Sequence, residues 1–437
     1  MSLASPQDLI YQLSDARART CALVDHLSEE QLVGPRLPTT NPLRWEIGHT
    51  AYFYEYWILR HHYKNDPILE NIDQLFDSIH IPHDSRWDLN LPSVEDTVEY
   101  MKTVKDRVIA YLSNGKEDNV RDYLTQYAIF HEDMHCEAFT YTRQTLGYPV
   151  PPIPVIPSKL NQSKSCNDDA SIPEGEFYLG AIRDEGFVFD NEKWAHKHHV
   201  NPFKIAKTAV SNGEYAEFVS EDGYLQKKYW CDEGWSWVNK MNLTQPVYWR
   251  KSETSNAWEV RWFDQWKLMD PKCAVINVNW YEANAYCRWA GRRLPTELEW
   301  EVAASAEPDS HGSKLSNSKR KFPWGNSGPT SRVANLNGET LGPISVDEKL
   351  EGASAFGCRQ MIGNVWEWTS SKFEPYPDFT PDMYEDYSQP LFGKTYVTRG
   401  GCWATRARLI RNTWRNYYGP ERNDVFTGFR TCAIENY

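Results

Sequence analysis

The sequence lacks any long apolar segment and any excess of basic side chains. No run approaches the roughly 20 apolar residues that cross a bilayer, and residues 1–8 have neither the basic end nor the apolar core of a secretion signal. The net charge of −13 disfavours nucleic acid or an anionic membrane as the main partner. We therefore expect a cytoplasmic protein with neither nucleic-acid nor membrane partners.

Cysteine is present but without a pattern. The nine cysteines form an odd, scattered set with no repeated short spacing. Secreted disulfide frameworks use even sets, and zinc-binding modules repeat closely spaced pairs. The cysteines are therefore expected to be reduced thiols, as in a cytoplasmic protein.

The chain is too long for one ordinary domain, because it has 437 residues. Residues 1–150 show helical periodicity, with amphipathic segments near 5–27, 42–63, 93–112 and 117–146. A proline-rich stretch then begins, and from about 173 the sequence has short strands, turns and most of the 19 tryptophans, with one clear helix at 279–289. We predict an α+β protein: a four-helix bundle (1–150), a linker (151–172) and an irregular domain (173–437).

Three histidines in the predicted bundle suggest a metal site. His131 and His135 are four residues apart, so on a helix they share one face, and His49 lies on another predicted helix. Three neutral imidazoles on one side of an iron or zinc ion leave positions open for catalysis. Packed histidines without a metal are the plain alternative. A second alternative is a zinc peptidase, because residues 131–135 read H-E-x-x-H with Glu132 as general base.

The second domain resembles the sulfatase-modifying-factor family, which includes formylglycine-generating enzymes and has an irregular C-type-lectin-like fold. The resemblance rests on six ordered segments: 277–283, 290–304, 322–326, 363–368, 399–401 and 428–430. Copper-dependent members need two cysteines after the Arg-Gly-Gly segment, since thiolates bind Cu(I). Here those positions are Thr405 and Ile410, with Cys402 where a serine is usual. A carbohydrate-binding lectin-like module is the remaining alternative, but it gives the three histidines no purpose.

The bundle resembles the DinB-like domain that precedes this module in ergothioneine-type sulfoxide synthases. In that family a histidine on one helix and a His-x-x-x-His-x-Glu motif on another hold iron(II). His49, His131, His135 and Glu137 match the motif in order and spacing. The resemblance implies that the three histidines bind iron, and that Glu137 orients a ligand ring from outside the ligand set.

The resemblance also implies the reaction. The small-molecule substrates are hercynine, which is Nα-trimethylated histidine, and a thiol or selenol donor. Iron(II) and O2 form a carbon–sulfur or carbon–selenium bond at the imidazole C2, as in ergothioneine or selenoneine biosynthesis. Bringing three reactants to one ion turns a three-body encounter into a positioned reaction.

Several substrate-binding roles follow from the same resemblance. Tyr376 aligns with a tyrosine that supplies a proton. Asn416 and Tyr417 align with a pair that holds the carboxylate and trimethylammonium groups of hercynine, and Arg422 aligns with an arginine that grips the donor's carboxylate. Ordinary packing is the alternative for each.

The chain departs from the best-known branch near the donor site. Tyr418 stands where the branch using γ-glutamylcysteine has an aspartate, so a counter-charge for an α-ammonium is lost. The segment around His83 and Asp84 looks more like the selenoneine-synthase branch, and these two side chains could bond sugar hydroxyls. We expect a selenosugar or thiosugar donor, with a cysteine-type thiol as the alternative.

Overall fold

The protein is described here by a computed structural model that covers residues 4–156, 166, 168–183 and 186–434. It divides into two compact units: residues 1–153 with 184–187, and residues 154–183 with 188–437. The division falls inside the proline-rich stretch, close to the predicted boundary at 150. Within the predicted linker, residues 157–165 and 167 lie outside the described residues.

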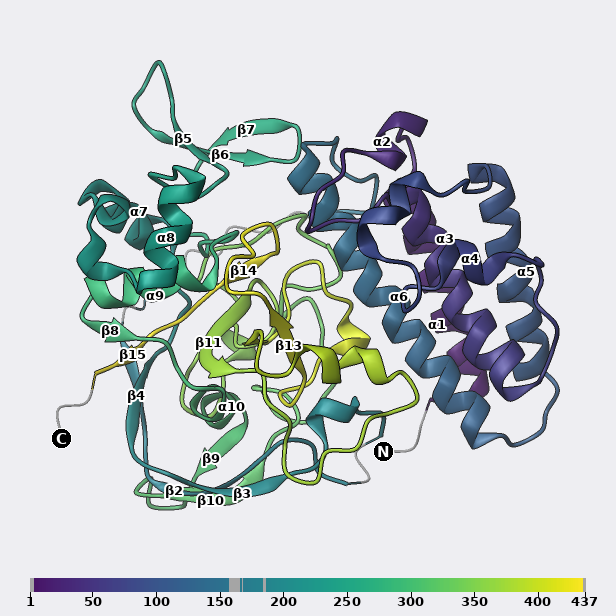
Figure 1. Ribbon diagram of the computed structural model, residues 1–437. Helices are drawn as coiled ribbons and strands as arrows, with labels where there is room; N and C mark the ends of the chain where they lie inside the picture. The colour runs from purple at the N-terminus through teal and green to yellow at the C-terminus, as the bar shows by residue number, and fades with distance from the viewer. Residues whose placement is uncertain (1–3, 157–165, 167, 184–185, 435–437) are drawn as a thin grey trace. The chain divides into compact units, whose positions relative to one another are not determined.

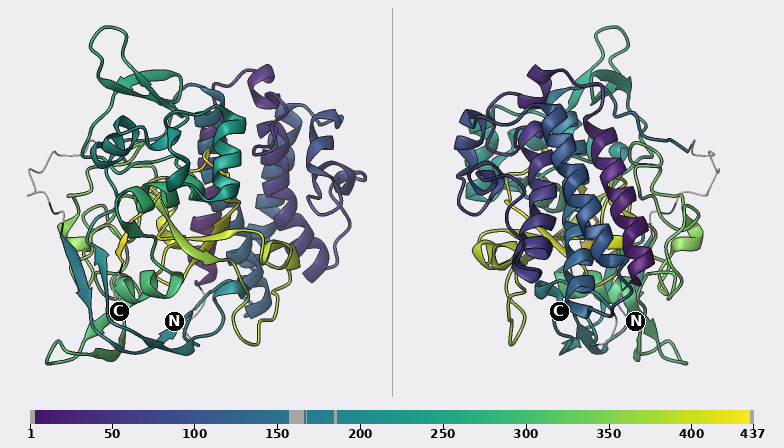
Figure 2. Two further views of the ribbon diagram at one scale, coloured as in Figure 1. Left: turned by 60° about the vertical axis from the view of Figure 1, so that its left-hand side comes forward. Right: turned by 90° about the vertical axis from the view of Figure 1, so that its right-hand side faces the viewer.

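The first unit is built on four long helices (Figure 1): α1 (Pro6–Val24), α3 (Leu43–Tyr54), α5 (Val94–Leu112) and α6 (Asn119–Leu146). Ser5, Ser93 and Asp118 cap three of them, each accepting a hydrogen bond from a first-turn backbone N–H. Helices α1 and α3 each pack against both α5 and α6, which closes a four-helix bundle (Figure 2). The predicted bundle is confirmed.

The connections in this unit contain structure that the sequence did not reveal. Two short helices, α2 (Glu29–Val33) and α4 (Ile72–Phe76), lie in the loops. The segment predicted as one helix over 42–63 changes after Tyr54 into a π-helical stretch, Glu55–His62. Such a stretch widens the helix and often lies near a functional site. A 3₁₀ turn covers His83–Asp88.

Among the residues that the structure describes, the second unit contains five small sheets, two of which have four strands. One has the order β1 (Asp169–Ile172), β4 (Phe203–Ala206), β15 (Cys432–Ala433), β8 (Arg292–Arg293). The other has the order β13 (Arg415–Tyr418), β12 (Tyr396–Arg399), β11 (Trp366–Lys372), β14 (Thr427–Gly428). In one two-stranded sheet β2 (Gly175–Leu179) pairs with β3 (His196–Val200), and in another β9 (Ala306–Pro308) pairs with β10 (Leu315–Lys319). The three-stranded sheet has the order β5 (Trp249–Lys251), β6 (Trp258–Trp262), β7 (Gln265–Leu268). Strands β1 and β15 both pair with β4, so the start and end of the unit are joined.

The expectation of a single clear helix in the second unit was incomplete. The predicted helix is α9 (Trp280–Trp289), but the described part of the unit has three more α-helices: α7 (Asn212–Ser220), α8 (Asp232–Met241) and α10 (Glu297–Ser305). They are nine or ten residues long, shorter than the window of about 11–18 residues in which hydrophobic periodicity is read. The sequence does carry a local signal for α10, the reciprocal capping box of Thr296 and Glu299.

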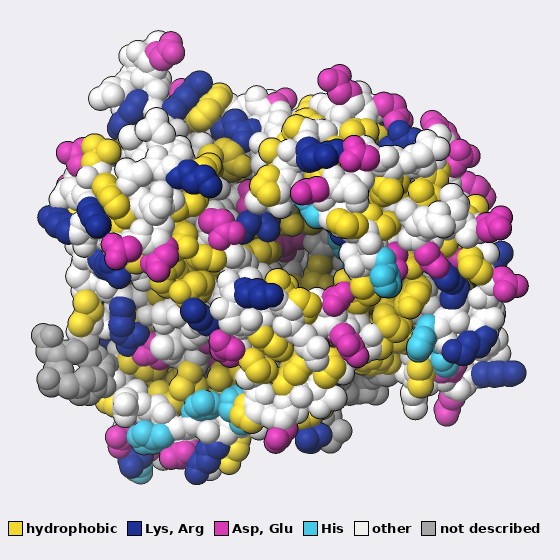
Figure 3. Space-filling model, viewed as in Figure 1, with side chains coloured by type: hydrophobic (Ala, Val, Ile, Leu, Met, Phe, Trp, Pro, Cys, Tyr) yellow, Lys and Arg dark blue, Asp and Glu magenta, His cyan; other side chains and the backbone are white. Residues whose placement is uncertain are grey.

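Surface and covalent features agree with the composition. No described helix is both long and apolar enough to span a membrane. No disulfide joins any two of the nine cysteines, all of which lie in the described part of the chain. On the face drawn in Figure 3, acidic and basic side chains are interspersed.

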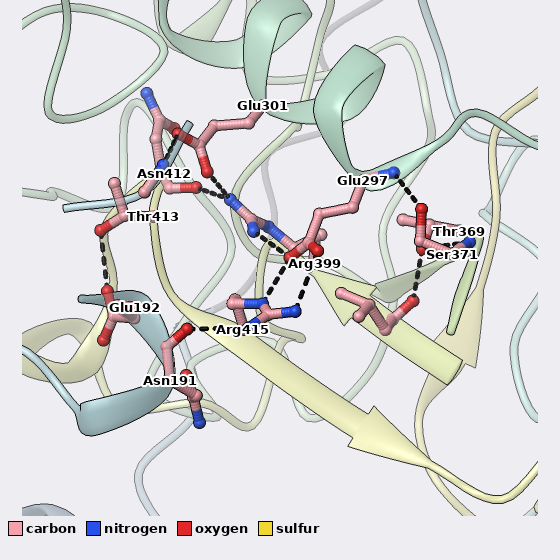
Figure 4. Close-up of polar contacts among 12 residues, drawn as sticks. Asn191, Glu192, Glu297, Glu301, Thr369, Ser371, Arg399, Asn412, Thr413 and Arg415 are labelled. Atoms are coloured by element: carbon pink, nitrogen blue, oxygen red, sulfur yellow. Dashed lines mark hydrogen bonds and ion pairs between the residues drawn. The ribbon is translucent and has the colours of Figure 1, made fainter. Parts of the chain in front are cut away.

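A network of buried charged side chains joins α10 to β12 and β13 in the second unit (Figure 4). Arg399 at the end of β12 donates to Glu297 Oε1 at 2.7 Å and to Glu301 Oε2 at 2.5 Å, both on α10. Arg415 on β13 donates to both oxygens of Glu297, at 2.7 and 3.1 Å. Because Glu297, Glu301 and Arg399 all lie in segments that carry the family resemblance, those segments hold much of the unit's buried charge.

Candidate metal centre

The structure brings together the three histidines that the sequence singled out. His49 lies on α3, and His131 and His135 lie one turn apart on the neighbouring α6. One ring nitrogen from each lies within 4.8 Å of the others. The ring centroids are 5.1 Å apart between His49 and each partner and 4.6 Å apart within the α6 pair. This spacing suits three nitrogens around one metal ion.

The burial of the three rings leaves the cluster accessible from one side. His49 and His131 are 4 % and 5 % exposed, whereas the side chain of His135 is 19 % exposed. Burial, with a contribution from His135, lowers the pKa of His49 and of His131 well below the ordinary imidazole value. Both rings are therefore neutral at pH 7 and offer lone pairs to a metal.

Neighbouring groups fix the orientation of the rings. His49 Nδ1 lies 2.9 Å from the carbonyl oxygen of Phe76. A carbonyl only accepts, so Nδ1 carries the proton and Nε2 is the nitrogen left for a metal. Trp45 stacks on His49 at 4.7 Å and Phe53 stacks on His131 at 3.9 Å. The donor set of three imidazoles, two of them already oriented and neutral, fits iron or zinc.

A carboxylate that the sequence analysis missed lies beside the third ring. Glu46 Oε1 is 3.4 Å from His135 Nδ1 and accepts a hydrogen bond from Asn41 Nδ2 at 3.0 Å. Glu46 precedes His49 by three residues, and this i, i+3 spacing on one helix face is the signal that could have identified it. Glu137, predicted for this role, is buried on α6, and its role stays a prediction.

Arg86, from the 3₁₀ turn, is linked to the cluster along two routes. Its Nη1 donates to Asn41 Oδ1 at 2.7 Å, and Asn41 in turn bonds Glu46. Its guanidinium carbon also lies 4.0 Å from the centre of the Trp45 ring, which stacks on His49. The turn is therefore linked to the three-histidine cluster through an arginine that the sequence analysis did not select.

The two residues of this turn selected from the sequence lie differently. His83 Nε2 is 3.0 Å from the carbonyl oxygen of Thr40, and its Nδ1 is 3.2 Å from Asp84 Oδ1. The Asp84 side chain is 85 % exposed. Both residues are accessible, and binding of a sugar by either stays a prediction.

The position of Glu132 argues against a zinc peptidase. Its Oε1 accepts a hydrogen bond from Thr20 at 2.7 Å and its Oε2 accepts one from Tyr54 at 2.9 Å, while Arg17 lies 3.3 Å away. The residue is fully buried among these partners. A peptidase base must instead face the water on the metal. The H-E-x-x-H spacing is present, but its glutamate serves the bundle core.

Tyr376 lies in the core of the second unit. It is 6 % exposed, and its hydroxyl donates to Glu297 Oε1 at 3.3 Å. The guanidinium carbon of Arg415 lies 4.0 Å from its ring centre. Burial raises the pKa of Tyr376 well above its ordinary value, so the phenol stays protonated at pH 7. Its contacts tie it to the buried charge network, and its role as a proton donor stays a prediction.

Three of the other selected residues follow one another on β13. Asn416 Nδ2 donates to the Tyr418 hydroxyl at 3.0 Å, so these two side chains meet. Tyr417, between them, stacks on Phe373 at 3.9 Å. Alternate residues of a strand face opposite sides, so Asn416 and Tyr418 share one face and Tyr417 faces the other. Their substrate contacts stay predictions.

Arg422 already holds a carboxylate of its own chain. Its Nε and Nη2 donate to the two oxygens of Asp424 at 2.6 and 2.7 Å. Its guanidinium carbon lies 5.5 Å from the ring centre of Tyr418, the residue that replaces the expected aspartate. A substrate carboxylate at Arg422 would therefore have to share or replace the contact with Asp424.

The positions aligned with the copper-binding cysteines of formylglycine-generating enzymes carry no thiol. Thr405 accepts a hydrogen bond from the Cys402 backbone N–H at 2.9 Å, and Ile410 is buried. A hydroxyl and an alkyl group are not soft ligands for Cu(I). This region therefore keeps the scaffold without the copper-binding thiol pair.

Gly48 is required for the contact that orients His49. A Cβ at this position would lie 2.2 Å from two ring atoms of Phe76, the residue whose carbonyl accepts from His49. We predict that Gly48→Ala displaces Phe76, lowers the free energy of unfolding by about 1–3 kcal/mol and weakens metal binding by roughly 10–100-fold. Urea denaturation and anaerobic Co²⁺ titration measure the two effects.

Gly328→Ala provides the control for this prediction, because a Cβ there meets no atom within 4 Å. It should leave both stability and metal affinity unchanged. A Gly48→Ala protein with wild-type Co²⁺ affinity would show that the Phe76 carbonyl does not govern the ligand.

Comparisons with known proteins identify both domains. Residues 12–139 match the DinB superfamily, and residues 157–435 match the sulfatase-modifying factor enzyme 1-like domain. The hercynine oxygenase of Mycobacterium tuberculosis is 35 % identical over 98 % of this chain and 99 % of its own. That of Mycolicibacterium thermoresistibile is 36 % identical over 97 % and 94 %. The formylglycine-generating enzyme of Thermomonospora curvata is 29 % identical and covers 60 % of this chain. The resemblance inferred from the motifs is confirmed, and the chain belongs to the hercynine oxygenase family.

Proposed function

We propose that this protein is an iron(II)-dependent oxygenase that uses O2 to join sulfur or selenium to the imidazole C2 of hercynine. The observation that carries the proposal is the convergence of His49, His131 and His135 within 4.8 Å. Full-length relatives named hercynine oxygenase support the choice of substrate.

The ligand set favours iron. Three imidazoles on one side of an ion leave several positions open, as in mononuclear iron oxygenases with a facial set of ligands. Bound iron(II) would supply the capacity to reduce O2 and a point where donor and hercynine meet. The exposed edge of His135 marks the side from which substrates would approach.

The chain's own residues prepare this centre before any substrate arrives. The Phe76 carbonyl holds His49 in one tautomer, and Trp45 and Phe53 fix two ring planes. Glu46 lies beside His135 Nδ1, where a carboxylate strengthens the opposite nitrogen as a ligand. Rings held in place in this way lose little freedom when the metal binds.

The substrate roles follow the same proposal. Asn416 would bond the hercynine carboxylate, and the face of Tyr417 would contact the trimethylammonium group, which an aromatic ring attracts. Tyr376 would supply a proton, and Arg422 would bind an anionic group of the donor. Because Tyr418 replaces an acid, we propose a selenosugar or thiosugar donor, with His83 and Asp84 bonding its hydroxyls.

A donor assay tests the proposal. The anaerobic Fe²⁺-loaded protein is mixed with hercynine and one donor, either cysteine, γ-glutamylcysteine or 1-seleno-glucose, and is then exposed to air. We expect mass spectrometry to detect a hercynine adduct with 1-seleno-glucose. Reactions without O2 or without hercynine should give none. Turnover with γ-glutamylcysteine instead would overturn the donor assignment, and no adduct with any donor would overturn the reaction.

A further inference from the structure

We propose a second metal site, formed by His196 and His198 on β3, that takes a borderline divalent ion such as Zn²⁺. Strand β3 pairs with β2 in a two-stranded sheet. Residues at i and i+2 of a strand point to the same face, so the two imidazoles lie side by side. Figure 3 shows histidine side chains gathered on the surface at the sheet of β2 and β3.

The geometry of the pair matches that of a pair in the bundle cluster. The His196 and His198 ring centroids are 4.8 Å apart, with an interplanar angle of 65°. For His131 and His135 the corresponding values are 4.6 Å and 61°. Two imidazoles in this relation can present a nitrogen each to one ion, with water completing the coordination.

Each ring has a nitrogen suited to a metal. His196 Nδ1 lies 3.0 Å from the carbonyl oxygen of Trp194, so it carries the proton and leaves the Nε2 lone pair available. His198 Nε2 is buried and has no hydrogen-bond partner among the residues that the structure describes. A buried polar atom left unpaired is unfavourable, and coordination of an ion would satisfy it.

The charged groups beside His198 are already paired with one another. Burial, with a contribution from His196, lowers the pKa of His198, and Glu301 acts in the opposite direction. Glu301 accepts from Arg399 at 2.5 Å and lies 2.7 Å from the Lys319 ammonium, so this carboxylate already has two cationic partners. The edge of His196 contacts the Tyr376 ring at 4.6 Å, an uncharged neighbour. Imidazole pairs favour Zn²⁺, Ni²⁺ or Cu²⁺ over Mg²⁺ or Ca²⁺.

The next residue on the strand, His199, offers a matched control. It faces the opposite side of β3, and its Nδ1 lies 3.3 Å from Glu176 Oε1. Its side chain is 58 % exposed. His199→Asn removes an imidazole from the same strand without touching the proposed pair.

Zn²⁺ titration of the full-length metal-free protein by calorimetry tests the site. We expect two equivalents in the wild type, one in the double variant H196N/H198N and two in H199N. H131A should lose the equivalent that binds the bundle cluster and keep the one at His196 and His198. The two variants therefore report on the two sites separately, and a failure of either proposal can be recognised by itself. Zn²⁺ should also raise the Tm of H131A, because an ion that binds only the folded protein stabilises it.

Two results would overturn the proposal: a double variant that still binds two equivalents, or a wild type whose single equivalent disappears in H131A. Circular dichroism checks that the double variant is folded. If it is not, the single variants H196N and H198N replace it, and each should weaken binding at one of the two sites at least tenfold. Unchanged affinity in both single variants would equally refute the site.

Discussion

His131→Ala should remove the metal and the oxygenase activity together. His131 is one of three imidazoles whose ring nitrogens lie within 4.8 Å of each other, and it is 5 % exposed, so water replaces it poorly. Loss of a partner outside the ligand set costs roughly 10–100-fold in metal affinity, and loss of a ligand should cost more. We expect no stoichiometric Fe²⁺ and no detectable hercynine adduct.

The experiment needs metal content, activity and fold measured on the same preparation. Anaerobic iron analysis after desalting gives the stoichiometry, and product mass gives the activity. The ring packs against Phe53 at 3.9 Å, so its removal opens a cavity, and circular dichroism must show that the helices persist. The exposed His61, on the π-helical stretch after α3, is the control.

His61→Ala should keep both iron and turnover. A folded His131→Ala protein that retained both one equivalent of Fe²⁺ and turnover would mean that the metal binds elsewhere. Retained iron with lost turnover would instead assign His131 to the reaction rather than to the metal.

The parts of the centre that the sequence predicted are those fixed by local geometry. His131 and His135 share a helix face whatever else the chain does, because their spacing alone decides it. The bundle was predictable for a similar reason, since caps such as Ser5 and Ser93 and apolar spacing mark each helix. The nearness of His49 required the family resemblance, because it depends on how α3 packs against α6.

The parts that were missed are contacts across elements. Glu46 reaches His135 on another helix, and the group that orients His49 is the backbone carbonyl of Phe76, which no side-chain pattern reveals. Glu137 was selected from motif spacing alone. For Glu132, the spacing fitted a peptidase while its partners on α1 and α3 gave it a structural role.

In the second unit, the local sequence signals for helices and strands were weaker, and strands that pair lie far apart in the sequence. Strand β4 pairs with β1 near the start of the unit and with β15 at its end, and no local pattern predicts such pairing. Tyr376 illustrates the consequence. Its position was aligned from a motif, but its hydrogen bond to Glu297 depends on α10, a helix that the sequence reading missed.

Arg399→Ala should destabilise the second unit more than any surface change. Arg399 is fully buried and donates to Glu297 and Glu301, so its removal leaves two buried carboxylates with fewer partners. Breaking a buried ion pair from one side costs about 3–5 kcal/mol. Against a typical total of about 5–15 kcal/mol, that loss is a large fraction of the unit's stability.

Arg250→Ala is the control, because it removes an arginine from an exposed ion pair. Arg250 also donates to a glutamate at 2.7 Å, but its side chain is 50 % exposed. An exposed pair contributes about 0–1 kcal/mol, so the same chemistry at the same distance should have a much smaller effect. Urea denaturation followed by tryptophan fluorescence measures both variants.

Acid should reduce the difference in the free energy of unfolding between the wild type and Arg399→Ala. Burial alone would raise the pKa of Glu301, but Lys319 and Arg399 outweigh it and hold that pKa below its ordinary value. A carboxylate with a lowered pKa contributes stability above its unfolded pKa and loses it as the pH falls through the folded value. The destabilisation by Arg399→Ala should therefore be full at pH 7 and shrink in acid.

Equal destabilisation by Arg399→Ala and Arg250→Ala at pH 7 would mean that the buried carboxylates find other partners. The Arg-Gly-Gly segment would then serve the fold in some other way.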